Sequence, residues 1–353
     1  MNHRMARAGV TLLAALFTAA TAASAAAGAP DPGRFDFFDD FTAGLDRWNT
    51  WRVATWSEHN MQTGHDRTFV EDDKLNLVFV NDSQDGWLGA AIQTRKEDFG
   101  YGRWEASLKP SDVPGVLNSM YTIDWGDGSA NHTRQEIDIE FLTHTFDDDY
   151  PGEVWIALHA RGRDSLWFSQ PLDINPSEQF NTWGWDIRPT HIDYLLNGQV
   201  IYTYVYAEND ITFDAPYMLK FNVWTSEGWW IQGPPPPDVE TIYQIDWVGF
   251  TELENLGPML GDMNADGARD TGDVAAFVLA LTDPDAFEAQ YGFDPALAGD
   301  VNGDGVLDTG DVTAFVDLTT NHPVPGPASG SVPEPGTLTL MGVAALLLMR
   351  RRR

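Results

Sequence analysis

The amino-acid sequence predicts an all-β fold, a two-sheet jelly-roll sandwich, followed by a small α-helical domain. The first observation behind this prediction is an alternation of apolar and polar residues, typical of strands with one buried face. The alternation is clearest at residues 74–80, 104–108, 136–141 and 240–250, all inside a Trp-rich region at 35–253 that holds every one of the 14 tryptophans.

The second observation is a hairpin signal. Asn197-Gly198 separates two alternating segments, 191–196 and 199–204, and this dipeptide favours a two-residue turn between antiparallel strands. The third observation is a change of composition after the Trp-rich region. Residues 261–321 are acidic and contain Arg269 as their single basic residue, so they form a separate predicted domain.

Composition excludes several classes of function. The 353 residues include 53 acidic and 21 basic side chains, and the formal charge of −32 would repel the phosphates of a nucleic acid. A nucleic-acid partner is therefore not expected. The absence of cysteine excludes disulfides, cysteine nucleophiles and thiolate metal centres.

The first 25 residues have the organisation of a secretory signal peptide. His3, Arg4 and Arg7 precede an apolar stretch at 10–20, and the small residues at 23–25 suit signal cleavage. A membrane anchor is the alternative, but the apolar stretch is shorter than the roughly 20 residues that a spanning helix needs. The mature chain is expected to begin near Ala26.

The C-terminal end predicts a sorting signal at residues 333–353, preceded by a linker at 322–332 that is rich in Pro, Gly and Ser. Pro333-Glu334-Pro335 is followed by an apolar run at 338–349 and then by four arginines. This order resembles the PEP-CTERM tail of exported bacterial proteins. The resemblance implies an exosortase-type processing enzyme as a partner, export through the inner membrane, and a location at the cell surface or outside the cell.

Three carboxylates mark the segment Gln135-Glu-Ile-Asp-Ile-Glu-Phe141. Alternation along a strand places Glu136, Asp138 and Glu140 on one face and the apolar residues on the other. Neighbouring anions repel, so at least one carboxyl group should keep its proton to a higher pH than usual. Glycoside hydrolysis requires such a pair of unlike carboxyl groups, although a solvated sheet face would show the same alternation.

The carboxylate segment and four further motifs resemble glycoside hydrolase family 16, in which lichenases and laminarinases are retaining endo-enzymes on a concanavalin-like jelly roll. The further motifs are Phe99-Gly-Tyr-Gly-Arg-Trp-Glu105, Phe180-Asn-Thr-Trp-Gly-Trp-Asp186, Phe221-Asn-Val-Trp224 and Ile245-Asp-Trp-Val-Gly-Phe250. The resemblance implies that Glu136 is the nucleophile, that Glu140 is the general acid and base, and that Asp138 tunes the nucleophile.

The resemblance also implies a set of substrate-binding residues. Aromatic faces stack on sugar rings, although most tryptophans of a sandwich belong to its core and a lone histidine is often structural. One departure concerns the substrate, because Arg134 stands where lichenase-like enzymes have Trp. The residues expected to contact substrate are Arg95, His159, Trp183, Asn222, Trp224 and Trp230.

We therefore expect an exported retaining endo-glycosidase that cleaves internal β-glycosidic bonds of a polysaccharide, most simply a β-1,3 or β-1,3-1,4 glucan, and that needs no cofactor for the chemistry. One alternative is a catalytically silent, lectin-like surface protein that binds polysaccharide. Others are an agar or carrageenan hydrolase and a transglycosylase of the same family.

The acidic region contains a duplicated loop, at residues 262–273 and 300–311. Oxygen-bearing side chains occupy loop positions 1, 3, 5, 9 and 12 and glycine occupies position 6, as in calcium loops. Each loop precedes a short apolar helix, at 274–281 and 312–318, and the pair resembles a type I dockerin. The resemblance implies two Ca²⁺ ions and a cohesin-like partner, and the family resemblance adds a possible structural Ca²⁺ at Asp246. The predicted ligands are Asp262, Asn264, Asp266, Asp270 and Asp273, then Asp300, Asn302, Asp304, Asp308 and Asp311.

Overall fold

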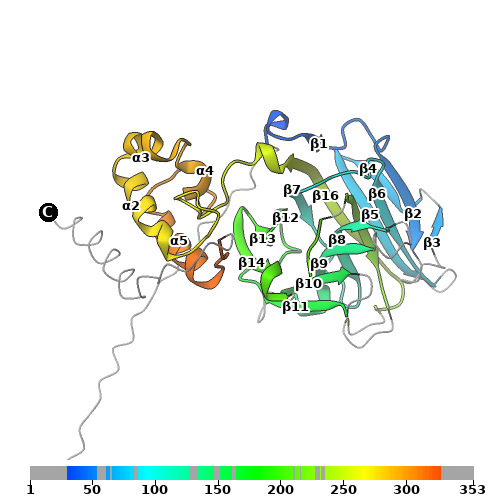
Figure 1. The fold of residues 1–353 in the computed structure, drawn as a ribbon. Helices are drawn as coiled ribbons and strands as arrows, with labels where there is room; N and C mark the ends of the chain where they lie inside the picture. Colours follow the sequence, from blue (N-terminus) through cyan, green and yellow to red (C-terminus); the bar gives the residue numbers. More distant parts are fainter. Residues whose placement is uncertain are drawn as a thin grey trace, which may run out of the picture.

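The computed structural model of the chain shows a β-sandwich with a small helical module beside it (Figure 1). The predicted signal peptide and the whole predicted sorting signal lie outside the residues that it describes. The described residues are 30–53, 61–63, 66–82, 86–126, 134–146, 152–160, 164–209, 211–214, 216–226, 231 and 235–326.

One face of the sandwich, here called the cleft sheet, has the strand order β11-β10-β9-β8-β15-β6, with β2 paired to β6 and β3 to β2. All of these pairs are antiparallel. Its strands are β2 (Trp48–Val53), β3 (Met61–Thr63), β6 (Gly86–Thr94), β8 (Leu117–Asp124), β9 (Gln135–Leu142), β10 (Glu153–Ala160), β11 (Leu166–Pro171) and β15 (Met218–Trp224).

The other face, the outer sheet, has the order β5-β16-β7-β12-β13-β14, with β1 paired to β16 and β4 to β5. The ends of β5 and β6 pair with each other and connect the two sheets. Its strands are β1 (Phe37–Asp39), β4 (Thr68–Glu71), β5 (Lys74–Asp82), β7 (Gly102–Lys109), β12 (Asn181–Ile187), β13 (His191–Leu196), β14 (Gln199–Val205) and β16 (Val239–Glu252).

The expected all-β sandwich is confirmed, together with the hairpin at its edge. Asn197 and Gly198 connect β13 to β14 with φ values of 51° and 82°. Both values lie in the left-handed region, which a tight hairpin turn requires and which Asn and Gly tolerate.

The apolar side of the carboxylate strand forms part of the core. Ile137, Ile139 and Phe141 are buried between the sheets, and the Phe141 ring meets the Trp183 ring edge-on with 4.9 Å between centroids. Because burial of these three side chains fixes the register of β9, the alternating carboxylates must point outward from the same strand.

The helical module has its own hydrophobic core. The predicted helices are confirmed as α2 (Val274–Thr282) and α5 (Asp311–Asn321), and the rings of Phe277 and Phe315 stack at 3.9 Å in that core. Two further helices were not expected from the sequence, α3 (Pro284–Tyr291) and α4 (Ala296–Gly299). The remaining short helices are η1 (Pro32–Arg34), η2 (Thr143–Thr145), α1 (Tyr206–Asn209), η4 (Leu253–Asn255) and η5 (Thr271–Asp273).

The expected linker boundary at residue 322 is wrong. Val324 is fully buried and exchanges two backbone hydrogen bonds with Arg269, at 2.8 and 3.0 Å, so the chain stays attached to the module beyond α5. In the part of the chain that the structure describes, no helix is long and apolar enough to cross a membrane.

Candidate active site

The three carboxylates lie side by side on β9, in the middle of the cleft sheet. Cross-strand pairing places Glu136 opposite Ile123 and His159, Asp138 opposite Tyr121, and Glu140 opposite Ser119 and Trp155. Neighbours that face each other across antiparallel strands point to the same side of the sheet. The register therefore gathers these polar and aromatic side chains around the carboxylates.

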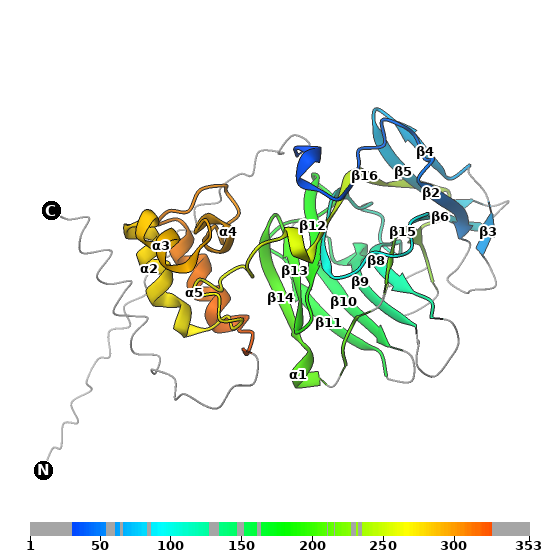
Figure 2. The same cartoon turned by 45° about the horizontal axis from the view of Figure 1, so that its top comes forward.

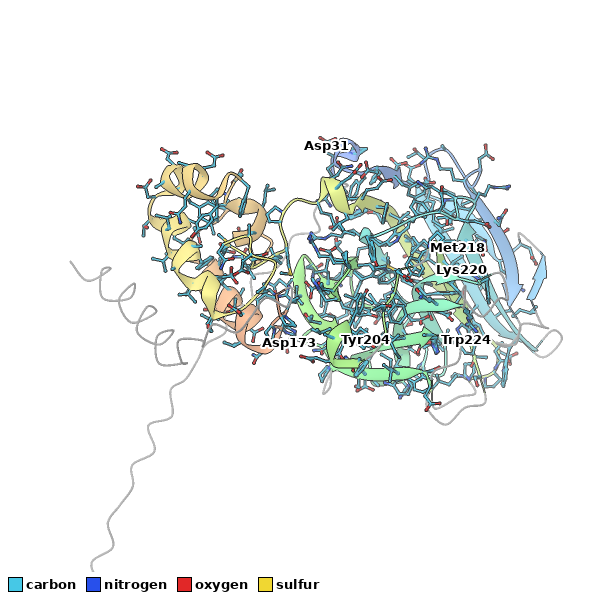
Figure 3. The ribbon with its side chains drawn as sticks, viewed as in Figure 1. Asp31, Asp173, Tyr204, Met218, Lys220 and Trp224 are labelled. Atoms are coloured by element: carbon cyan, nitrogen blue, oxygen red, sulfur yellow. The ribbon has the colours of Figure 1, made fainter. Side chains whose placement is uncertain are left out.

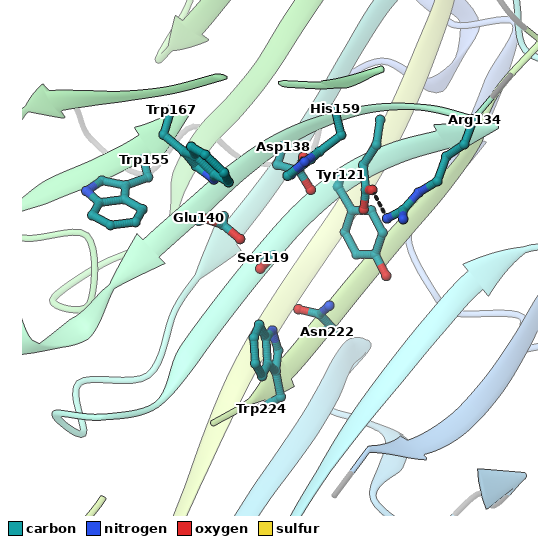
Figure 4. A pocket seen from close by; sticks show the side chains of 11 residues that line it. Ser119, Tyr121, Arg134, Asp138, Glu140, Trp155, His159, Trp167, Asn222 and Trp224 are labelled. Atoms are coloured by element: carbon teal, nitrogen blue, oxygen red, sulfur yellow. Dashed lines mark hydrogen bonds and ion pairs between the residues drawn. The ribbon is translucent and has the colours of Figure 1, made fainter. Parts of the chain in front are cut away.

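These side chains line a cleft of about 540 Å³ (Figure 4). Trp155 and Trp167 lie on one side of the carboxylates, and Trp224 lies on the other. Trp167 is 57% exposed, which is unusual for so large an apolar side chain and leaves its face open to a ligand. The lining residues are Ser119, Tyr121, Arg134, Glu136, Asp138, Glu140, Trp155, His159, Trp167, Asn222 and Trp224.

Glu136 has a cation as its direct partner. The Arg134 guanidinium donates a hydrogen bond to Glu136 Oε2 and lies 5.2 Å from the centre of the Trp125 ring. Glu136 itself is only 4% exposed. An adjacent guanidinium offsets the negative charge of a buried carboxylate through a charge-assisted hydrogen bond.

The other two carboxyl groups have the opposite electrostatics. Burial, followed by the charges of Glu136 and Glu140, raises the pKa of Asp138 well above its usual range. Burial and the charge of Glu136 raise the pKa of Glu140 to about 8. At neutral pH Glu140 therefore carries a proton, whereas its neighbour Glu136 is paired with the Arg134 guanidinium, and glycoside hydrolysis requires such an unlike pair.

His159 extends the site from β10. Its Nε2 lies 3.6 Å from Asp138 Oδ2, and its Nδ1 lies 2.7 Å from Ser165 Oγ. The ring also meets Trp167 edge-on at 5.8 Å. Burial lowers the pKa of His159, so the imidazole is uncharged at pH 7. It lines the cleft as a group that can form hydrogen bonds.

Strand β15 supplies the opposite side of the cleft with three side chains at alternating positions. Asn222 and Trp224 line the cleft as expected, and Lys220 lies two residues before Asn222 on the same strand (Figure 3). The Lys220 ammonium is buried, 5.3 Å from the centre of the Tyr121 ring and 5.2 Å from that of Trp125. Burial lowers the pKa of Lys220 to about 8, partly offset by the attraction of Glu136.

Two of the expected substrate-binding residues do not line this cleft. Trp183 is fully buried between the sheets, because it lies at an inward-facing position of β12, so its assignment to the cleft is wrong. Arg95 is exposed at the end of β6, and its Nε donates to the Trp48 carbonyl at 3.1 Å. Trp230 lies outside the described residues.

Sequence reasoning missed several cleft residues. Ser119 and Tyr121 come from β8, which is buried along its whole length, and Trp155 comes from β10, where burial alternates over the first four residues. The alternation in β10 was a usable signal for which of its residues share a face, and β8 offered no such signal. The alternation could not show which strands flank β9, and only the pairing in the folded chain supplies that information.

The two acidic loops of the module adopt matching conformations. Asp262 accepts hydrogen bonds from the backbone N–H groups of Asp266 and Gly267, and Asp300 accepts from those of Asp304 and Gly305. Their donor set, carboxylate and amide oxygens, is chemically suited to Ca²⁺. Within the described residues, however, no three acidic or histidine side chains converge into a ready-made metal centre.

The Asp246 carboxylate, where a further calcium ion was expected, lies 3.2 Å from the Lys74 ammonium. This lysine gives the carboxylate a cationic partner within the protein.

Comparison with protein families identifies the class of this protein. The model of glycosyl hydrolases family 16 matches residues 51–249, more than half of the chain. The chain belongs to this family and is a glycoside hydrolase acting on O-glycosyl bonds. A second model, the PEP-CTERM protein-sorting motif, matches residues 331–353.

Individual relatives agree with this assignment. The chain is 28% identical over 232 residues to a beta-glucanase of Brevibacillus brevis, covering 63% of this chain and 81% of the relative. It is 24% identical over 237 residues to a beta-glucanase of Bacillus licheniformis, covering 65% and 89%. A xyloglucan endotransglucosylase/hydrolase of Arabidopsis thaliana is 23% identical over 188 residues, covering 51% and 57%.

Solved structures share the fold. A family 16 enzyme from the mixed-linkage glucan locus of Bacteroides ovatus superposes with a TM-score of 0.52 at 18% identity, covering 61% of this chain and 99% of that one. The catalytic domain of an endo-1,3-beta-glucanase from Thermotoga petrophila gives 0.51 at 19% identity, covering 61% and 96%.

Proposed function

We propose that this protein hydrolyses internal bonds of a β-1,3 or β-1,3-1,4 glucan, with retention of configuration at the anomeric carbon. The observation that carries the proposal is the unlike pair on β9, an Arg-paired Glu136 and a protonated Glu140. The relatives named as beta-glucanases support the choice of a glucan as substrate.

The two glutamates divide the reaction between them. Glu140 donates its proton to the glycosidic oxygen, while Glu136 attacks the anomeric carbon and forms a glycosyl-enzyme ester as the leaving sugar departs. Glu140, now ionised, then removes a proton from water, whose oxygen attacks the same carbon and releases Glu136. The raised pKa of Asp138, caused by burial and by the neighbouring carboxylates, disfavours a second negative charge beside the nucleophile.

The aromatic side chains would hold the glucan in place for this chemistry. The apolar faces of glucose rings stack on indole rings, and Trp155, Trp167 and Trp224 flank the carboxylates on both sides, with Trp167 the most exposed of the three. Asn222 and Ser119 supply polar groups for the sugar hydroxyls.

The test is an activity assay on residues 30–326, which contain both domains. The protein is incubated with mixed-linkage glucan, laminarin, xyloglucan, agarose and carrageenan, and new reducing ends, product lengths and the anomer first formed are measured. We expect β-anomeric oligosaccharides from one of the two glucans. Glu136→Gln should reduce the rate by about 10⁴-fold or more without altering the fold.

The other outcomes identify the alternatives. Release from agarose or carrageenan would replace the glucan by a galactan, and longer chains without new reducing ends would indicate a transglycosylase. Binding without any cleavage or transfer would contradict the enzyme and support a surface lectin. An α-anomer as the first product would contradict the glycosyl-enzyme intermediate.

The location of the activity follows from the C-terminal motif. The PEP-CTERM match indicates export and sorting to the cell surface. We infer that an exosortase-type enzyme processes this tail, which would place glucan cleavage at or outside the cell surface. Mass spectrometry of the protein from its native host would show whether the chain ends before the arginine cluster.

We also propose that each acidic loop of the module binds one Ca²⁺ ion. Asp273 and Asp311 are fully buried at the last loop positions, and burial raises the pKa of Asp273 to about 7. A divalent cation would stabilise the ionised form of such carboxylates. The expected ligands are side-chain oxygens of the predicted set and a backbone carbonyl of each loop.

Calorimetric titration of residues 30–326 tests the calcium proposal. We expect two bound Ca²⁺ ions and a melting temperature that rises with calcium and falls with chelator. Asp273→Asn should remove one ion, whereas Glu288→Gln, an exposed change on α3, should leave both. No calcium-dependent heat or shift would contradict the proposal. The cohesin-like partner stays a prediction.

A further inference from the structure

The helical module is seated on the outer sheet of the sandwich, at the β13–β14 hairpin (Figures 1 and 2). The Gln199 side-chain amide donates to the carbonyl of Asn302 in the second acidic loop at 3.1 Å. Val200 packs against the core of the module. A Cβ atom on Gly303 would lie only 3.0 Å from the carbonyl oxygen of Asn197, so the loop backbone follows the hairpin closely.

One side chain of the module enters the sandwich, and it is the only cation of the acidic region. Arg269 is completely buried. Its Nη1 and Nη2 donate to the two carboxylate oxygens of Asp193, at 2.6 and 2.8 Å. Nη2 also donates to Thr203 Oγ1 at 2.9 Å. This is a bidentate contact of the strong, planar kind that arginine forms with carboxylates.

The module orients the same guanidinium from its other side. Arg269 Nε donates to the His322 carbonyl at 2.8 Å, and Nη1 donates to the Leu260 carbonyl at 3.3 Å. The backbone of Arg269 is fixed by its two bonds to Val324. The chain entering the module and the chain leaving it therefore both hold Arg269 in the direction of β13.

The receiving surface is a buried polar site on the sandwich. Asp193 is 2% exposed, and it accepts a hydrogen bond from Thr203 Oγ1 at 2.6 Å. His191 Nε2 lies 3.4 Å from it. The nearby arginines Arg103 and Arg188 contact Asp186. Without Arg269, a buried carboxylate would lose its bidentate cation, and such a loss is strongly destabilising.

We propose that Asp193 and Thr203 form a docking site for the C-terminal module of the same chain, and that Arg269 locks module and sandwich into one cooperative folding unit. The module is then fixed to the outer sheet of the sandwich and is not an independent domain on a flexible linker. It covers the hairpin that ends the outer sheet, where an uncovered edge strand would invite pairing with other chains. The cleft lies on the other sheet and stays accessible.

Thermal unfolding of residues 30–326 tests the proposal, with activity measured on the substrate found above. The wild-type chain should unfold in one transition as a monomer. Arg269→Met should lower the melting temperature by about 10 °C or divide the transition in two, and should increase proteolytic cleavage between the domains. Turnover at temperatures below unfolding should be unchanged.

Two matched variants control for a general loss of charge or packing. Arg34→Met removes an exposed Arg–Glu pair on the same sandwich, with Glu105 at 3.3 Å, and should shift the melting temperature by no more than about 2 °C. Thr203→Val removes a single bond to Arg269 and should give a smaller shift than Arg269→Met. If Arg269→Met does not fold, Thr203→Val and Asp193→Asn provide the comparison.

Three results would overturn the proposal. Two independent transitions in the wild-type chain would show that the domains are not one unit. Additive effects of Arg269→Met and Asp193→Asn would show that the two side chains are not coupled. A wild-type dimer that becomes monomeric in Arg269→Met would show that the docking site receives the module of a second copy.

Discussion

The two buried acid clusters of the catalytic domain lie on different sheets and have opposite electrostatics. In the cleft, burial raises the pKa of Asp138 and Glu140, and one arginine contacts only Glu136. On the outer sheet, arginines hold the pKa of Asp186 below its usual range and the pKa of Asp193 well below it, despite burial. The same fold therefore produces reactive carboxyl groups on one side and inert ones on the other.

The difference lies in how completely the cations offset the buried negative charge. Asp186 is contacted by both Arg103 and Arg188, at 3.1 and 3.0 Å, and Asp193 by Arg269 in bidentate fashion. A carboxylate that is paired with arginine stays ionised at neutral pH, so it can stabilise the packing around it but cannot act as an acid. The cleft leaves Glu140 without such a partner among the described residues, and a group that holds its proton to about pH 8 can act as an acid.

After Glu136, replacement of Glu140 should have the largest effect on turnover. Glu140→Gln removes the proton donor, and we expect kcat on glucan to fall by about 10³-fold. Aryl glycosides whose phenolate leaves without protonation should lose much less, because their departure needs no acid. Hydrolysis rates on both kinds of substrate provide the measurement. Equal losses on both would show that Glu140 has a structural role.

The pH profile should show the next largest effect. Because the pKa of Glu140 is about 8, the general acid is protonated at neutral pH and loses its proton as pH rises. Activity should therefore fall about tenfold per pH unit above pH 8. The measurement is kcat/KM determined over a series of pH values. A plateau to pH 10 would contradict the assignment.

Much of this arrangement could be predicted from the sequence, because local patterns encode it. The alternation around Glu136, Asp138 and Glu140 fixes which side chains share a face, and Asn197-Gly198 fixes a hairpin. The duplicated loops likewise predict the helices α2 and α5 that follow them. These are all features of contiguous segments.

Features that depend on which strands become neighbours could not be predicted in the same way. Trp183 and Trp224 are both tryptophans within family motifs, yet one is core and the other lines the cleft. The contact between Arg269 and Asp193 joins residues far apart in the chain, and the acidic repeat gave no indication that its single arginine points into another domain.

Lys220 tests whether the cations of the cleft act on the reaction itself. Lys220→Met removes a buried positive charge whose electrostatic partner is Glu136, and we expect kcat/KM to fall about tenfold. Lys109→Met is a matched control, because that ammonium also lies over an aromatic ring, Phe180 at 5.8 Å, but on the outer sheet. The Lys220→Met variant should still lose activity at alkaline pH, because that loss is due to Glu140. Equal activity of both variants would contradict a role for Lys220.

The smallest effects are slopes of stability against pH, and these should have opposite signs for the two clusters. Glu140 has a folded-state pKa above its unfolded value, so the folded protein binds the extra proton and stability falls as pH rises from about 4.5 to 8. Asp193 has a lowered pKa, so its contribution is present above 3.8 and is lost as pH falls through its lower folded-state pKa. Each group changes the free energy of unfolding by at most about 1.4 kcal/mol per pH unit.

Denaturant unfolding at a series of pH values separates the two contributions. Glu140→Gln should reduce the decline between pH 4.5 and 8, to which Asp138 and Asp273 also contribute, because one of the protons that the native state retains is gone. It should leave the loss at acid pH, because the outer cluster is intact. Asp193→Asn should reduce the acid loss and leave the decline toward pH 8. If each substitution altered both ranges equally, the two clusters would be coupled through the sandwich. The contrast between a reactive and an inert acid cluster would then no longer describe two independent sites.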